Sequence, residues 1–267
     1  MSTTASGAPA EPVAETSAPG LSPEQLQEVF ALLPGSDSVE LKVSVPDASR
    51  RSVVEALGMD VMRAQIRQVA FFDTRDLALN RHGVVVRARR IQGRDGDSVV
   101  KLRPVVPSQL SGDLRRAKGF GVELDAMPGG FVCSARMKAA AKDADLHRVF
   151  RGEEPVRKVF TKRQWALLEE SAPEGVALDG LEVLGPVNIL KLKFEPEGYP
   201  RPMVAELWFY PDGSRILELS AKCLPDEAFT AAAESKAFIA AHGVDLGAPQ
   251  QTKTRTALAF FTGDQPG

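Results

Sequence analysis

Several residue types that support common functions are scarce in this chain of 267 residues. Two cysteines are too few for a disulfide framework, and the three histidines have no metal-ligand spacing. Lys and Arg number 33 against 35 Asp and Glu, and a net charge of −2 excludes a basic body that wraps duplex nucleic acid. No apolar run approaches the roughly 20 residues of a membrane span, and no secretory signal is present. We therefore expect a cytoplasmic protein without a membrane or duplex nucleic acid as partner.

The rest of the composition is that of a globular protein, with 43% apolar and 25% charged residues. Residues 1–20 are mostly Ala, Ser, Thr, Pro and Gly, which predicts a disordered tail. Ser22 and Gln25 have the spacing of a capping box around Pro23, which predicts a helix start. We expect residues 21–263 to form a single domain.

Alternating charged and apolar residues predict eight strands. We place them near residues 39–45, 64–72, 84–91, 99–104, 120–126, 187–195, 203–210 and 215–223. The interval of about 129–180 has helix formers at 135–150 and 162–170, punctuated by Pro and Gly, and predicts a helical insertion between the fifth and sixth strands. Two more helices are expected near 227–242 and 252–261.

The strands have two unlike faces. In the first, Glu40 and Lys42 point to one side while Val39 and Leu41 point to the other. A solvated charged face is the ordinary interpretation of this pattern. If the strands instead close into a barrel with the charged face inward, both signs of charge line its interior. The cations are Lys42, Arg87, Arg89, Lys101, Arg103, Lys191 and Lys193, and the carboxylates are Glu40, Glu123, Asp125, Glu206 and Glu218.

The energetics of such an interior indicate its ligand. Two like charges about 6 Å apart cost roughly 3 kcal/mol at an effective dielectric constant near 20, so the cations favour a polyanion between them. Arginine adds bidentate geometry for phosphate oxygens. Carboxylates repel a polyanion unless a divalent metal bridges the two, as Mg²⁺ commonly does. The pattern therefore predicts a site for polyphosphate together with a metal.

Three segments carry a resemblance to a known family: Phe-Phe-Asp-Thr-Arg-Asp-Leu-Ala-Leu at 71–79, Arg-Ala-Arg-Arg at 87–90 after Gly83, and Val-Lys-Leu-Arg at 100–103. This pattern closely resembles the CYTH family, also called the triphosphate tunnel metalloenzymes. The resemblance covers about residues 39–223, and 251–258 look like the closing helix. It implies an α+β fold, an eight-stranded antiparallel β-barrel or tunnel with surrounding helices. Its members hydrolyse inorganic, thiamine or nucleoside triphosphates, cyclise ATP, or bind polyphosphate.

The match to the family's charged motifs is partial. The first strand of the family has Glu-x-Glu-x-Lys, where this chain has Ser38, Glu40 and Lys42, and Glu218 is followed by Ser220 where the family has a second Glu. The resemblance implies three metal ligands for Mg²⁺ or Mn²⁺, a water-orienting and a second catalytic residue, and seven phosphate-binding cations. These are Glu40, Glu218 and Asp125 for the metal, Glu123 and Lys42 for catalysis, and Lys42, Arg87, Arg89, Lys101, Arg103, Lys191 and Lys193 for phosphate.

The leading hypothesis is a divalent-metal-dependent phosphohydrolase, a triphosphatase that acts on inorganic, nucleoside or thiamine triphosphate in a cationic tunnel. Two alternatives stay open. The degenerate acidic motif favours a module that binds triphosphate or polyphosphate without cleaving it, and the same family contains adenylate cyclases. We expect a monomer or a homodimer.

Overall fold

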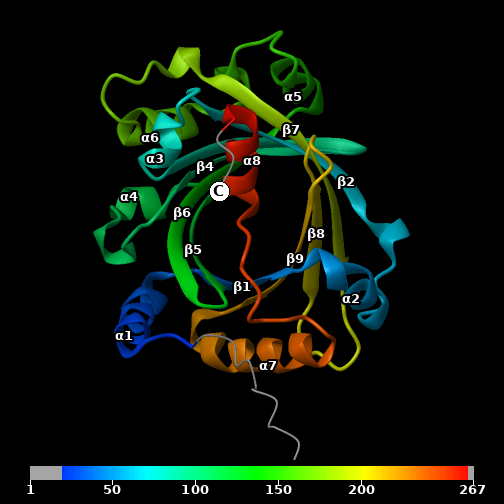
Figure 1. Cartoon of the computed structure of the whole chain (residues 1–267). Helices are drawn as coiled ribbons and strands as arrows, with labels where there is room; N and C mark the ends of the chain where they lie inside the picture. Colours follow the sequence, from blue (N-terminus) through cyan, green and yellow to red (C-terminus); the bar gives the residue numbers. More distant parts are fainter. Residues whose placement is uncertain (1–19, 264–267) are drawn as a thin grey trace, which may run out of the picture.

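The computed structural model describes residues 20–263, which form a closed β-barrel with helices around it (Figure 1). The order around the barrel is β1-β5-β6-β4-β3-β2-β7-β8-β9, and β9 pairs with β1 to close it. The strand bounds are β1 Ser38–Val45, β2 Gln65–Asp73, β3 Val84–Ile91, β4 Arg94–Leu102, β5 Phe120–Met127, β6 Gly130–Ala141, β7 Glu182–Phe194, β8 Met203–Phe209 and β9 Arg215–Cys223.

The expected closed barrel with surrounding helices is confirmed, but its strand number and direction are not as predicted. The described residues form nine strands rather than eight. The barrel is also mixed, because β1 lies between β9, with which it is antiparallel, and β5, with which it is parallel. In the parallel pair Glu40 lies opposite Asp125. This one pairing decides which carboxylates become neighbours.

The additional strand is β6, which takes up the first part of the interval expected to be a helical insertion. Its alanines and Met137 favour a helix locally. Tertiary pairing outweighs that preference, because β6 forms a hairpin with β5 and is paired along its other edge with β4. Gly129 makes the hairpin turn with a φ of +80°. Within this interval the first helix begins at Asp143, so the expected helix over 135–150 is wrong in its first half.

Helices cover the outside of the barrel (Figure 1). The first begins as predicted, since Ser22 and Gln25 form a capping box around its N-terminus. Asp73 stabilises the start of a short helix after β2, because its carboxylate accepts hydrogen bonds from the backbone N–H groups of Thr74, Leu79 and Asn80. The helix bounds are α1 Pro23–Leu32, α2 Arg50–Ala56, α3 Ala78–Arg81, α4 Gly112–Arg115, α5 Asp143–Phe150, α6 Lys162–Ser171, α7 Ala228–Ala241 and α8 Lys253–Thr262.

The apolar core lies mainly between the barrel wall and the helices. Leu146 of α5 and Leu168 of α6 pack on the outward-facing Phe72, and α1, α2 and α7 cover the outer faces of β1 and β9. One end of the barrel interior is also apolar, because Leu258 of α8 packs there in a cluster with Trp208. The remaining interior is left to charged side chains.

The other expectations concern the ends of the chain and membranes. Within residues 20–263, no helix has the length and apolar character required to cross a bilayer. Cys133 and Cys223 are free, buried thiols. The predicted disordered tail, apart from Gly20, lies outside the described residues.

Candidate functional site

The barrel encloses a cavity of about 500 Å³, which we call the lumen. Eleven Lys and Arg residues and five carboxylates line it. The structure brings together here all but one of the residues predicted for the site: Glu40, Lys42, Arg87, Arg89, Lys101, Arg103, Glu123, Asp125, Lys191 and Glu218. The charged faces of the strands therefore point inward, and the ordinary interpretation of a solvated face does not apply.

Lys193 is the predicted residue that the structure places elsewhere. It follows Lys191 by two positions on β7, so the strand alternation is as expected. Lys191, however, lies opposite Gln65, which is the first residue of β2. Lys193 therefore lies beyond the end of β2, although it is still opposite Val204 on β8, and it is exposed and lines a surface groove beside Gly58.

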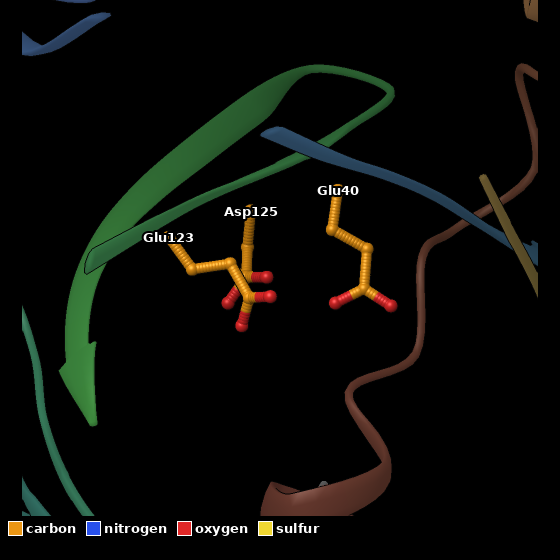
Figure 2. Close-up of side chains that lie close together, drawn as sticks. All are labelled: Glu40, Glu123 and Asp125. Atoms are coloured by element: carbon orange, nitrogen blue, oxygen red, sulfur yellow. The ribbon is translucent and has the colours of Figure 1, made fainter. Parts of the chain in front are cut away.

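An acidic cluster lies on one side of the lumen, formed by Glu40, Glu123 and Asp125. Figure 2 shows Glu123 and Asp125 on β5 beside Glu40 on β1. One carboxylate oxygen from each residue lies within 4.8 Å of those from the other two. Carboxylates at this separation repel by about 3 kcal/mol per pair at an effective dielectric constant near 20, so the cluster requires cations.

Lysines supply those cations in the structure. The Nζ of Lys42 lies 2.8 Å from Asp125 and 3.2 Å from Glu40, and the Nζ of Lys101 lies 2.7 Å from the other oxygen of Asp125. Burial opposes ionisation of Asp125, but the two lysines outweigh it and hold the pKa of this carboxyl well below its usual range. Burial likewise opposes the charge on Lys42, yet Asp125 and Glu40 raise its pKa. Both Lys42 and Asp125 are therefore ionised at neutral pH.

The acidic cluster can hold a divalent metal. Its three donors are carboxylate oxygens, which Mg²⁺ and Mn²⁺ prefer over nitrogen or sulfur. Glu40 is ionised at neutral pH, because Lys42 and Lys222 outweigh the effect of burial and lower its pKa. Glu123 pairs with Lys222 and lies 3.6 Å from Arg136. A metal at this cluster has to compete with ammonium groups already present.

Glu218, predicted as a metal ligand, lies outside the acidic cluster. It is opposite Ser44 on β1 and Glu206 on β8, and the Nζ of Lys253 lies 2.7 Å from its carboxylate. Lys253 also pairs with Glu206, which accepts a second bond of 2.7 Å from Lys191. Burial opposes the charge on Glu206, but the two lysines lower its pKa well below the usual range. A lysine therefore stands beside Glu218 where the sequence predicted a metal.

Three other arginines of the lumen have no such partners. We call Arg67, Arg87 and Arg103 the arginine wall; they come from β2, β3 and the end of β4. Among the described residues, none of the three forms an ion pair, and the Nε of Arg87 has no hydrogen-bond partner at all. Burial, followed by the neighbouring charge of Arg89, lowers the pKa of Arg87 to about 10. Arg87 is still cationic at neutral pH, so the wall presents to the cavity positive charges that form no direct ion pair among the described residues.

Arg89 shows how an arginine in the same interior is satisfied when an acid is near. Its Nε lies 2.8 Å from Asp97, and Lys138 lies 3.2 Å from the other oxygen of that carboxylate. Asp97 is buried on the neighbouring strand β4, directly opposite Arg89. The absence of an equivalent acid opposite Arg87, where Val99 is the partner, is therefore a local property of the wall.

Sequence reasoning missed five cations of the lumen, and one of them, Lys222, continues the alternation of Glu218 and Ser220 along β9. Arg136 and Lys138 lie on β6. Because a helix was expected there, their strand-like alternation with Ala135 and Met137 was not recognised. Arg67 is separated from other charges along β2, and Lys253 reaches the lumen from the N-terminus of α8. The alternation in β6 was the available signal for Arg136 and Lys138, whereas no local pattern marks Arg67 or Lys253.

Two solved structures are similar to the chain over most of its length. A candidate adenylate cyclase from Bacillus halodurans matches with a TM-score of 0.58 and 11% identity, covering 83% of this chain and 97% of its own. A candidate adenylyl cyclase from Hippeastrum, described as having a dominant triphosphatase activity, matches with a TM-score of 0.61 and 15% identity, covering 85% and 96%. No family model and no curated protein matches the chain. The chain therefore has the closed-barrel fold of these two proteins.

Proposed function

We propose that this protein is a triphosphate tunnel enzyme, a divalent-metal-dependent phosphohydrolase that acts on a triphosphate-containing substrate in the lumen. The observation that carries this proposal is the arginine wall, above all Arg87, whose buried guanidinium lacks a partner among the described residues. Leaving a buried charge unpaired costs several kcal/mol in general, which a bound anion would offset. Triphosphate, with several charged oxygens along a chain, suits arginines that come from three different strands.

In this proposal the arginine wall and the lysines beside Asp125 have different roles. Arg67, Arg87 and Arg103 bind phosphoryl oxygens and orient the chain of phosphates. Lys42 of β1 and Lys101 of β4, both held by Asp125, reach the same cavity. Charge that develops on the transferred phosphoryl group in the transition state is stabilised by such positioned cations.

Glu40 and Asp125 would hold the Mg²⁺ or Mn²⁺ in this scheme, because both are ionised and adjacent across the parallel pair β1 and β5. When bound, the metal supplies charge neutralisation between these carboxylates and the phosphates. In this proposal Glu123 orients the attacking water, which is supported by its position in the lumen and by its partner Lys222, whose side chain is half exposed. The water oxygen bonds to the terminal phosphorus, the bridging oxygen leaves with the diphosphate, and one proton is released.

The second candidate, a module that binds triphosphate without cleaving it, is favoured by one specific observation. Every carboxylate of the acidic cluster already lies within an ion-pair distance of a lysine. Ser38, where the family has a further Glu, is opposite Glu123 on the neighbouring strand. A cluster short of one acid and neutralised by lysines binds a metal less strongly than a free one, which reduces turnover before it reduces anion binding.

Phosphate release distinguishes the two candidates. The protein is incubated with inorganic triphosphate or ATP, with and without Mg²⁺ or Mn²⁺, and phosphate and cyclic AMP are measured by chromatography. We expect phosphate release that requires metal and is lost in Lys101→Ala, whereas the matched variant Lys193→Ala, outside the lumen, retains it. Tight binding of triphosphate without release favours the binding module. Release that persists in Lys101→Ala, or absence of both binding and release, contradicts the proposal.

A further inference from the structure

An apolar groove lies outside the barrel wall, beneath α7, and has a volume of about 340 Å³. The outward-facing residues of β1 and β5 form its floor, among them Leu41 and Ala126. Ala232 of α7 and Leu246 of the following segment form its cover. Figure 1 shows α7 below β1, with the segment that leads to α8 rising from it across the barrel. The volume is within the usual range of small-molecule sites, whose lower end is roughly 300 Å³.

The groove adjoins the lumen. Four residues line both cavities, namely Lys42, Met127, Gly130 and Phe131. Three of them belong to the tip of the β5–β6 hairpin, which therefore separates the two spaces. The space beside Gly130 at the hairpin tip is open, because a Cβ added there would meet no atom within 4 Å. Gly130 is therefore the position at which a ligand of the lumen would enter the groove.

The chemistry of the groove differs from that of the lumen. Among the described lining residues, Lys42, Ser235 and Lys236 alone carry side-chain nitrogen or oxygen. The hydroxyl of Ser235 is already engaged, since it lies 2.5 Å from the hydroxyl of Tyr199. Sugar hydroxyls placed in this groove would therefore be left without partners, which is costly, whereas methylene groups would be transferred out of water favourably.

We propose that the groove beneath α7 binds the apolar organic group of a triphosphate ester whose phosphates lie in the lumen. This inference rests on the proposed function and deepens it, because it names the substrate class. The preferred substrate is an alkyl or aryl triphosphate, which binds more tightly than inorganic triphosphate or a nucleoside triphosphate. The hairpin tip at Gly130 is the point where the charged part of the substrate ends and the apolar part begins.

Two esters of equal charge test this inference. The affinities of methyl triphosphate, hexyl triphosphate and ATP are measured by isothermal titration calorimetry without divalent metal, so that no ligand is consumed. We expect hexyl triphosphate to bind at least about tenfold more tightly than methyl triphosphate, because its additional methylene groups are buried. Filling the groove with Ala232→Phe, or raising the hairpin tip with Gly130→Leu, brings this ratio close to one.

Gly180→Leu is the matched control, since Gly180 is exposed and a Cβ there would meet only Ala177, at 4.0 Å. It retains the preference for the hexyl ester. Equal affinities of the two esters for the natural protein would overturn the inference while leaving the proposed function intact. Tighter binding of ATP than of hexyl triphosphate would assign the groove to a nucleoside and overturn it too. If equal affinities accompany a dimer in sedimentation, the groove belongs to a second copy of the chain. If methyl triphosphate did not bind at all, both the proposed function and the inference about the groove would be contradicted.

Discussion

The acidic side of the lumen and the arginine wall differ in how their charges are balanced. On the acidic side, each of the five lining carboxylates has a lysine within ion-pair distance: Glu40, Glu123, Asp125, Glu206 and Glu218. On the wall, Arg67, Arg87 and Arg103 have no carboxylate partner among the described residues, and Arg67 donates instead to the amide oxygen of Gln65. The acidic side is therefore balanced by its own lysines, whereas in the proposed function an external anion balances the wall. Substitutions on the acidic side should change stability, and substitutions on the wall should change binding.

The largest effect is expected for Asp125→Asn, which would break the acidic side. The substitution keeps the shape of the side chain but leaves Lys42 and Lys101 without their shared carboxylate. Removing one partner of a buried ion pair costs about 3–5 kcal/mol of unfolding free energy. Urea denaturation at neutral pH measures the loss. The control Asp113→Asn breaks an exposed pair with Arg116 and should change stability by less than about 1 kcal/mol.

If Asp125→Asn lowered the unfolding free energy by as little as the control does, Lys42 and Lys101 would be stabilised by water rather than by Asp125. The acidic side would then not differ from an ordinary solvated surface, and the comparison with the wall would fail.

Lys253→Met is expected to cost about 3 kcal/mol of unfolding free energy, because it leaves Glu206 and Glu218 facing each other with only Lys191 beside them. The same change frees Glu218 and one oxygen of Glu206 for a metal. We therefore expect one more bound Mn²⁺ per chain than in the natural protein, counted by electron paramagnetic resonance, and partial recovery of stability when Mn²⁺ is added. Lys118→Met, at an exposed position, is the control.

If Lys253→Met binds no additional Mn²⁺, the lysine is not a replacement for a metal at Glu218. Its contact with the face of Trp208, at 5.3 Å, would then be the better explanation for its burial.

On the wall, Arg87→Met should separate binding from stability. The affinity for inorganic triphosphate should fall by about a hundredfold, since an arginine contributes charge-assisted hydrogen bonds of about 1.5–3 kcal/mol each. Unfolding free energy should stay constant or rise, because the substitution removes a buried charge whose Nε is unpartnered. Calorimetry and urea denaturation measure the two quantities on the same sample. A marked loss of stability would show that the wall is balanced internally after all.

Much of this site could be predicted from the sequence because strand alternation is local. Lys101 and Arg103 share a face with each other whatever the rest of the chain does, and so do Arg87 and Arg89. The same alternation gave the inward direction of the charged faces once a closed barrel was assumed. The resemblance around Asp73 extended the prediction to the fold, and that residue proves to cap α3 rather than to line the lumen.

What could not be predicted depends on which strands become neighbours. The acidic cluster exists because β1 is parallel to β5, which places Glu40 opposite Asp125, and no feature within either segment indicates that pairing. Glu218 forms its ion pair with Lys253 because α8 packs into one end of the barrel, which is again a long-range contact. Helix-forming residues in β6 concealed Arg136 because pairing on both edges outweighs local preference.

The smallest expected effect tests where the barrel ends. Lys191 and Lys193 have the same direction along β7, and the sequence gives no reason to treat them differently. Lys191 donates to Glu206 inside the lumen, whereas Lys193 is exposed beyond the first residue of β2. Lys193→Met should therefore change triphosphate affinity by less than about twofold and stability by less than about 0.5 kcal/mol. Lys191→Met should exceed both values, because Glu206 loses a buried partner. Equal effects of the two substitutions, measured by calorimetry and urea denaturation, would place the edge of the charged interior farther along β7 than the pairing with Gln65 indicates.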